Sequence, residues 1–106
     1  MIDNLKSQMR KGMLEYCILL VLKKRTMYTT EIIETLRNSK LIVVEGTVYP
    51  ILSRMKSNGL LGYYWQESTS GPPRKYFQIT PTGESLLEDL ASEWQNLTDT
   101  INHLQK

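Results

Sequence analysis

The feature that most constrains the fold is a change of period within residues 45–65, EGTVYPILSRMKSNGLLGYYW. Its apolar residues first recur at three- and four-residue steps, the spacing that places side chains on one face of an α-helix. Gly59 then stands where helices commonly end in a left-handed residue, and an aromatic run typical of a β-strand follows at once. The stretch therefore predicts a helix that starts near Glu45, with a first turn distorted by Pro50, and leads directly into a strand. Its inward stripe comprises Val48, Ile51, Leu52 and Met55.

Two further helices are predicted ahead of this stretch. Residues 5–24 carry apolar side chains at helical spacing, namely Met9, Met13, Leu14, Ile18, Val21 and Leu22. The run KKRTMYTT breaks that pattern, and Thr29 or Thr30 is suited to cap a second helix that ends before RNSK. The β-branched segment LIVV at 41–44 is too short for anything except a strand or an extended lead-in to the next helix.

A hairpin and a last helix are predicted after it. The runs LLGYYW and RKYFQI have strand composition, and the turn formers in QESTSGPP between them predict a hairpin with a long tip. Thr80 is suited to cap a fourth helix, in which Pro81 takes the first position and which runs to the end of the chain. The predicted order is helix, helix, helix, hairpin, helix.

Length and composition bound the remaining possibilities. A chain of 106 residues, 41% of them hydrophobic, is expected to form one domain with one modest core. The most apolar run, at 13–22, is shorter than the roughly 20 residues that span a bilayer, and the N-terminus does not resemble a signal peptide, so we expect a cytoplasmic protein without a membrane partner. The single cysteine, Cys17, and the single histidine, His103, are far apart in sequence and predict neither a disulfide nor a metal site; we expect a core thiol and a surface imidazole.

Charge is distributed unevenly along the chain. Residues 1–80 hold 12 Lys and Arg against 6 Asp and Glu, whereas residues 81–106 hold 1 against 5. A basic first part is suited to a polyanion, although a solvated basic surface would have the same composition.

Three short helices followed by a hairpin is the order of a winged helix, in which the third helix enters the major groove and the hairpin contacts the flanking backbone. We therefore expect a mainly α protein with a small β-hairpin: a winged helix-turn-helix domain at 1–80 and a separate C-terminal helix at 81–106. The outward face of the third helix carries hydroxyls, a phenol and a cation suited to bases and phosphates, or simply to water. These residues are Tyr49, Pro50, Ser53, Lys56 and Ser57. In the hairpin, Gly71-Pro72-Pro73 is a stiff segment that delivers Arg74 and Lys75.

The last helix carries a seam of apolar residues at an average spacing of 3.5, which is typical of helices that pair. The seam comprises Leu87, Leu90, Trp94, Leu97, Ile101 and Leu104. We expect it to form a homodimer interface. Because most homo-oligomers are twofold, the two reading helices would address half-sites of a palindromic operator about 34 Å apart.

The pieces EGT-x-YP and GPPRKY, in this order and spacing, resemble the PadR family of bacterial transcriptional regulators, in its short form with a single C-terminal dimerisation helix. The resemblance implies a dimeric winged-helix repressor that a small aromatic or drug-like effector releases from DNA. It places Thr47 and Tyr49 in the recognition-helix motif, and Gly71, Arg74 and Lys75 in the wing. This sequence departs from the family pattern at Val44, at Thr29-Thr30 and at Ser53, where the family tends to have Ser or Asn, a Gly-Tyr pair and a basic residue.

Two questions stay open at this point, the role of Trp94 and the kind of partner that the chain binds. Trp94 is either an interface anchor or one wall of a site for a flat aromatic or cationic effector. The chain is either a DNA-binding repressor or a winged-helix module that binds another protein, as the low net charge also permits. An enzyme is not expected, because no nucleophile with a nearby base, metal cluster or phosphate loop stands out, and no cofactor is predicted.

Overall fold

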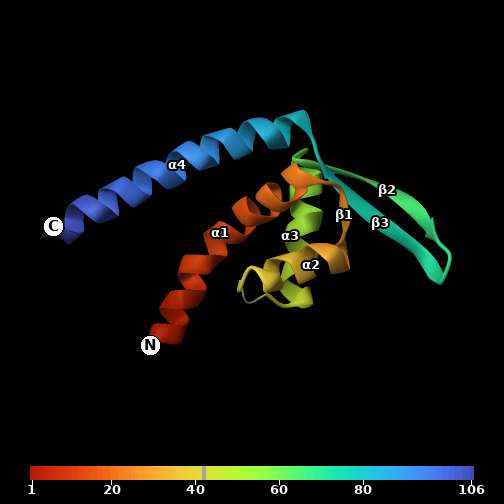
Figure 1. The fold of residues 1–106 in the computed structure, drawn as a ribbon, viewed down its shortest axis with the longest axis horizontal. Coiled ribbons are helices and arrows are strands. Elements are labelled where there is room, and N and C mark those ends of the chain that lie inside the picture. Colours follow the sequence, from red (N-terminus) through yellow and green to blue (C-terminus); the bar gives the residue numbers. More distant parts are fainter. Residues whose placement is uncertain (42) are drawn as a thin grey trace.

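The computed structural model describes residues 1–41 and 43–106, which form four helices and one three-stranded antiparallel sheet (Figure 1). The helices are α1 (Ile2–Lys24), α2 (Thr29–Asn38), α3 (Glu45–Ser57) and α4 (Pro81–Gln105), and the strands are β1 (Met27–Tyr28), β2 (Leu61–Ser68) and β3 (Gly71–Ile79). The molecule measures 56 × 32 × 22 Å. It is elongated because α4 and the N-terminal half of α1 diverge from a compact centre, while β2 and β3 project from the opposite end (Figure 1). The predicted winged-helix architecture is confirmed.

The core lies where the first three helices meet the base of the sheet. The predicted stripe of α3 is buried in full, and it packs with apolar side chains of α1, α2 and the strands. The most deeply buried of these are Ile18, Leu19, Ile32, Leu52, Met55 and Val48. Burial of this stripe leaves the opposite face of α3 in solvent, which is what a reading helix requires.

The sheet contains a strand that the sequence did not indicate. Met27 and Tyr28 lie within the run interpreted as a break between helices, yet they pair with β3 opposite Phe77 and Tyr76, giving the order β1-β3-β2. Met27 and Phe77 are both buried, so this short pairing closes the core beneath the hairpin. A two-residue strand carries no period of its own, since its conformation is fixed by a partner about 50 residues away.

The predicted long tip of the hairpin is wrong. β2 continues to Ser68 and β3 begins at Gly71, so only Thr69 and Ser70 form the turn. Pro72 and Pro73 belong to β3, beside an irregularity in the register. Prolines are tolerated there because β1 pairs only with the far end of β3, leaving the other edge of this segment unpaired.

Helix boundaries differ in detail from the prediction. The N-cap of α2 is Tyr28 instead of Thr29 or Thr30, and its backbone N–H donates to the Glu31 carboxylate at 3.2 Å. α2 also continues through Arg37 and Asn38. In the 41–44 segment Leu41, Val43 and Val44 form no strand, and Val44 is extended and precedes α3; Ile42 lies outside the described residues.

One joint connects the end of α3 to the start of α4. Gly59 adopts the predicted left-handed conformation, with φ of 77°, and the Leu60 N–H donates to the Met55 carbonyl at 3.0 Å. The Thr80 hydroxyl donates to the Gly59 carbonyl at 2.6 Å and accepts from the Gly83 N–H at 3.0 Å. Thr80 therefore caps α4, as predicted, and also ties it to the C-terminus of α3.

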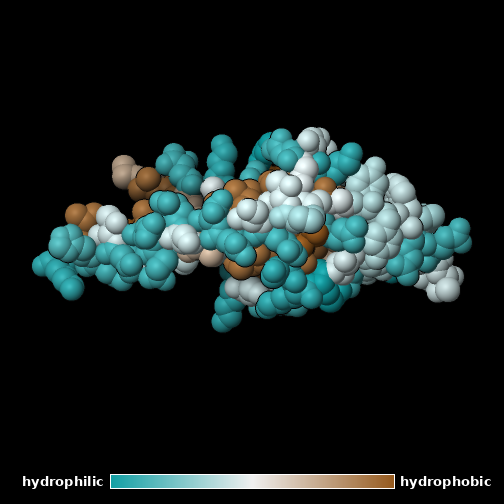
Figure 2. Space-filling view, turned by 90° about the horizontal axis from the view of Figure 1, so that it is seen from above, coloured by the Kyte–Doolittle hydropathy of each residue, from teal (hydrophilic) through white to brown (hydrophobic). Residues whose placement is uncertain are grey.

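The seam of α4 divides into two parts. Leu87 is only 7% exposed and belongs to the core of its own chain, and Leu90 packs partly against that core. Leu87 is therefore not available to a partner, which corrects that part of the predicted dimer interface. Trp94, Leu97, Ile101 and Leu104 remain exposed, and hydrophobic side chains reach the surface toward the end of the molecule away from the hairpin (Figure 2).

Candidate nucleic-acid interface

The outward face of α3 is exposed along its whole length. Tyr49 is 52% exposed, and Thr47, Ser53 and Lys56 are also in solvent. A salt bridge from Arg54 to Glu15 of α1 helps to hold the helix in place from its flank. The face thus presents hydroxyls and one ammonium group on a helix whose other side is fixed in the core.

The cations of the sheet rest on aromatic rings. Lys75 Nζ lies 3.9 Å from the centre of the Tyr63 ring, and Lys56 Nζ of α3 lies 5.4 Å from the same ring. On the other face of the sheet, the Arg74 guanidinium lies 4.6 Å from the centre of the Tyr28 ring. Such contacts hold a cation in position without cancelling its charge.

Most Lys and Arg residues in the described part of the chain, these three included, have no carboxylate within 4.0 Å. Arg54, Arg25 and Lys23 each form a salt bridge with a carboxylate. Among residues 1–41 and 43–106, no carboxylate lies within 4.0 Å of Lys56, Arg74 or Lys75. The positive charge beside the α3 face is therefore left free for an anion from outside.

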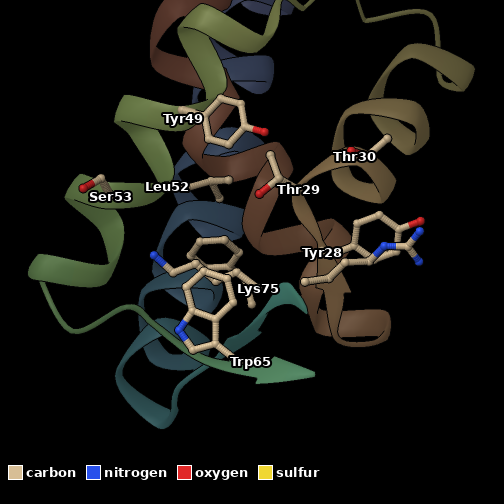
Figure 3. A pocket seen from close by; sticks show the side chains of 10 residues that line it. Tyr28, Thr29, Thr30, Tyr49, Leu52, Ser53, Trp65 and Lys75 are labelled. Carbon is tan, nitrogen blue, oxygen red and sulfur yellow. The ribbon is translucent and has the colours of Figure 1, made fainter. Parts of the chain in front are cut away.

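A groove of about 490 Å³ separates α3, the N-terminus of α2 and the sheet (Figure 3). Its floor includes the buried Leu52 and Phe77, and Tyr49 and Trp65 lie on opposite sides of it with Thr29 between them. Among the residues that the structure describes, no acidic side chain lines it. The lining consists of Tyr28, Thr29, Thr30, Tyr49, Leu52, Ser53, Trp65, Arg74, Lys75 and Phe77.

The groove brings together four of the predicted DNA-binding residues: Tyr49, Ser53, Arg74 and Lys75. Lys56 does not line the groove but contacts the ring of Tyr63. Thr47 lies near the start of α3 and lines a second cleft with Arg10 and Lys11 of α1. Gly71 is exposed beside the hairpin turn and does not line the groove.

Sequence reasoning missed Thr29 and Trp65 as groove residues. Trp65 pairs directly with Lys75 across the two strands, and it is 63% exposed. The signal available in the sequence was alternation: residues two apart on a strand share a face, so Tyr63, Trp65 and the partner of Trp65 had to lie together. Thr29 carried no such signal, because its place depends on β1.

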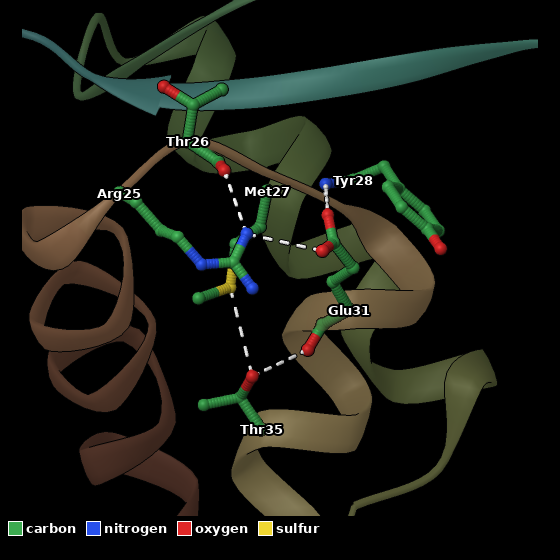
Figure 4. A network of polar contacts seen from close by, with 6 residues as sticks. All are labelled: Arg25, Thr26, Met27, Tyr28, Glu31 and Thr35. Carbon is green, nitrogen blue, oxygen red and sulfur yellow. Dashed lines mark hydrogen bonds and ion pairs between the residues drawn. The ribbon is translucent and has the colours of Figure 1, made fainter. Parts of the chain in front are cut away.

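A polar network fixes the N-terminus of α2 at one wall of the groove (Figure 4). Glu31 accepts from the Tyr28 N–H and forms a salt bridge with Arg25 at 3.1 Å. One turn later, the Thr35 hydroxyl donates to the Glu31 carbonyl at 2.8 Å. The start of α2, where Thr29 and Thr30 line the groove, is thereby fixed in place.

A separate small cleft lies between α1 and α4. It has a volume of about 100 Å³ and is lined by residues that include Tyr16, Trp94 and Leu97. Small-molecule sites generally occupy about 300 Å³ or more. Within one chain, Trp94 therefore forms one wall of a space too small for a drug-sized molecule.

Residues 1–41 and 43–106 contain no group of three metal-ligating side chains. In the same ranges, no helix is long and apolar enough to cross a membrane. Cys17 is half-buried against the core, and burial raises the pKa of its thiol above the ordinary value. A raised pKa makes it a poor nucleophile at neutral pH.

A buried three-helix core, a reading helix with one free face and a cationic hairpin beside it define the winged-helix class of regulatory proteins. The model of the transcriptional regulator PadR-like family matches residues 18–89, and the chain belongs to this family. This match confirms the sequence-based assignment to the family. Members of the family are transcription regulators and not enzymes.

Solved structures of related proteins agree with this assignment. A PadR-like transcription factor from Bacteroides fragilis is 57% identical, with 96% of this chain and 99% of that chain covered and a TM-score of 0.82. A PadR-like transcriptional regulator from Bacillus cereus is 36% identical over 94% of this chain and 98% of that one, with a TM-score of 0.82. A PadR family regulator from Clostridium difficile is 31% identical over 90% and 100%, with a TM-score of 0.83.

Proposed function

We propose that this protein is a dimeric repressor that binds a palindromic operator in duplex DNA through α3 and the β2–β3 wing. The observation that carries the proposal is a set of three cations without carboxylate partners in the described residues: Lys56 and Lys75 lie on the Tyr63 ring beside the exposed face of α3, and Arg74 lies on the Tyr28 ring on the other face of the sheet. Phosphate oxygens of DNA would pair with these cations. Tyr49, Ser53 and Thr47 would form hydrogen bonds with base edges or phosphates.

The alternative, a winged-helix module that binds another protein, is less well supported. Protein interfaces generally lose charged residues at their centre, whereas this groove concentrates cations and contains no carboxylate. A strongly acidic protein would be needed to match it. The low net charge of +2 does not argue for such a module, because it is the sum of a basic balance in residues 1–80 (12 Lys and Arg against 6 Asp and Glu) and an acidic balance in residues 81–106 (1 against 5).

Dimerisation is supported by the exposed part of the α4 seam. Trp94, Leu97, Ile101 and Leu104 form an apolar row on a helix that extends beyond its own core. α1 carries exposed Ile2, Leu5 and Met9 on the diverging arm (Figure 1). A second chain covering both arms would bury this surface and set two reading helices at half-sites about one duplex turn apart. We retain residues 1–80 as the DNA-binding unit and 81–106 as the dimerising unit, in a functional sense, since the first turns of α4 share the core.

Release by a small aromatic or drug-like effector is part of the proposal. The cleft beside Trp94 holds only about 100 Å³ in one chain. Two such clefts facing each other across a dimer would provide a larger space between two indole rings. Repression follows if the operator overlaps the promoter, since the bound dimer then excludes the polymerase.

The decisive experiment compares two double variants by fluorescence anisotropy on duplex DNA from the gene's own upstream region. Arg74→Ala with Lys75→Ala removes two adjacent groove cations, and Lys23→Ala with Lys24→Ala removes two adjacent cations at the end of α1. Each phosphate contact contributes roughly 0.9 to the slope of log affinity against log salt, so the wing variant should lose up to about 2 units of slope and the control none. Equal slopes for the two variants would reject the wing contact, and no salt-sensitive binding by the wild type would reject the function.

A further inference from the structure

We propose that the groove between α3, the N-terminus of α2 and the sheet is a binding site for a single nucleotide unit, a base that carries a phosphate. Occupation of this site would compete with the operator for the same side chains. The binding step is independent of the DNA proposal, whereas its regulatory consequence rests on the proposed function.

The first argument is an incomplete polar side chain. Thr29 is 9% exposed and lines the groove, yet its hydroxyl has no hydrogen-bond partner in the part of the chain that the structure describes. No buried side-chain oxygen or nitrogen in these residues is sealed off without a partner, so the Thr29 oxygen must open onto the groove. Figure 3 shows that oxygen on the groove side. A hydroxyl that opens onto the groove and has no partner in the described residues is available to form a hydrogen bond with a ligand.

The second argument is the shape and chemistry of the walls. The groove has an apolar floor that includes Leu52 and Phe77, and the rings of Tyr49 and Trp65 on opposite sides of it offer surfaces on which a planar ring can stack. Base–aromatic stacking contributes about 1–3 kcal/mol per base and tolerates any base. Trp65 is 63% exposed in the chain as it stands, so a stacked base would cover apolar surface now left in water.

The third argument concerns charge. The groove is lined by Arg74 and Lys75 and by no carboxylate, and it adjoins the N-terminal end of α2. This end carries partial positive charge from the helix dipole, part of which the Glu31 carboxylate in the first turn offsets. An anion beside the ring is therefore favoured and a cationic ligand is not. A volume of about 490 Å³ lies within the usual range for small-molecule sites.

The test uses thymidine 5′-monophosphate as the probe and thymidine as its uncharged match. Binding is measured by calorimetry on the wild-type protein, and by fluorescence of Trp65 in a Trp94→Phe variant, where it is the one remaining tryptophan of the two. We expect quenching by the monophosphate, and affinity about tenfold or more above that of thymidine, because hydrogen bonds to charged groups discriminate by that amount. Equal affinities, or no heat and no quenching at millimolar concentration, would overturn the proposal.

Two substitutions locate the site. Thr29→Val keeps the shape of the side chain and removes the hydroxyl, and it should weaken the monophosphate by up to about tenfold. Thr82→Val, an exposed position on α4, is the matched control and should have no effect. An equal loss in both variants, or no loss in Thr29→Val, would exclude the groove as the site, and thermal unfolding of each variant establishes that it is folded.

Two further measurements identify the source of the nucleotide and test whether it competes with duplex DNA. Oligothymidylate that binds more tightly than the monophosphate would support the site and identify an unpaired strand as its source, whereas equal affinity would support a free nucleotide. Displacement of a labelled duplex by the monophosphate supports competition; co-occupancy of both refutes it. Should the duplex fail to bind at all while the monophosphate binds, the proposed function fails and the nucleotide site stands.

Discussion

Gly83, near the start of α4, lies against the backbone at Leu60 with no room for a side chain. A Cβ atom added there would lie 2.2 Å from the Leu60 carbonyl oxygen and 2.8 Å from a methylene carbon of Ile79, whereas real Cβ contacts are essentially never shorter than 3.0 Å. The substitution Gly83→Ala therefore requires a displacement of about 0.8 Å between α4 and the backbone at Leu60. That backbone cannot yield freely, because the same carbonyl accepts from the Thr80 N–H at 3.1 Å.

The magnitude follows from opposing terms. Overpacking of this kind costs about 1–3 kcal/mol, and weakening of the Leu60–Thr80 hydrogen bond costs about 1 kcal/mol more. Alanine in a helix gains at most about 1 kcal/mol over glycine. The net loss is about 2 kcal/mol in the free energy of unfolding, which corresponds to a fall in Tm of about 8–16 °C for a domain of this size.

The assay is thermal unfolding followed by circular dichroism at one fixed protein concentration, since unfolding of a dimer depends on concentration. Gly46→Ala is the control, because Gly46 is an exposed helical glycine whose added Cβ would meet no atom within 4 Å. We expect the control to unfold at the wild-type temperature or slightly above. A Gly83→Ala protein that unfolds no earlier than its Gly46→Ala counterpart would refute the reasoning.

Three further predictions concern the joint, the seam and the thiol. Thr80→Val removes the cap of α4 and the hydrogen bond to the Gly59 carbonyl. It should lower the free energy of unfolding, measured by urea titration, by about 1–2 kcal/mol. A smaller effect would contradict the role of Thr80 in connecting α3 to α4. Ile101→Asp should give a folded 12.3 kDa monomer in light scattering, since Ile101 is 46% exposed in one chain, whereas Asn102→Asp, with the same charge change, should not. Cys17, whose thiol pKa is raised by burial, should be alkylated by iodoacetamide more slowly in the native than in the unfolded protein at mildly alkaline pH; equal rates would show that it is freely accessible.

Local rules accounted for the parts of the fold that depend on neighbours in sequence. The buried stripe of α3, the left-handed Gly59 and the Thr80-Pro81 start of α4 each follow from spacing or from backbone preference within a few residues. The strand β1 and the register of the hairpin do not. Both depend on pairing between distant segments, which the composition of KKRTMYTT and QESTSGPP does not report.

The candidate site was predictable to the same extent. Tyr49 and Ser53 follow from the face of a helix, and Arg74 and Lys75 from their place in the chain, but not the rings on which the two cations rest. Gly-Pro-Pro indicated a turn that would carry Arg74 and Lys75 outward. In the structure they lie within β3 on opposite faces of the sheet, because the strand continues past both prolines. Sequence thus identified the charged residues, whereas the groove they line required the tertiary pairing.

In the proposed dimer, the joint at Thr80 would couple the direction of α4 to the position of α3 on DNA. Through one side chain, the C-terminus of α3 and the N-terminus of α4 share hydrogen bonds, so the direction of α4 is tied to the direction of the reading helix. α4 has 25 residues and is therefore about 37 Å long, so a tilt of about 10° at the joint displaces its far end by about 6 Å. Half-sites one duplex turn apart tolerate little change in spacing. Any ligand that alters the packing of Trp94 or Leu97 against a partner would therefore alter operator affinity without touching the DNA face.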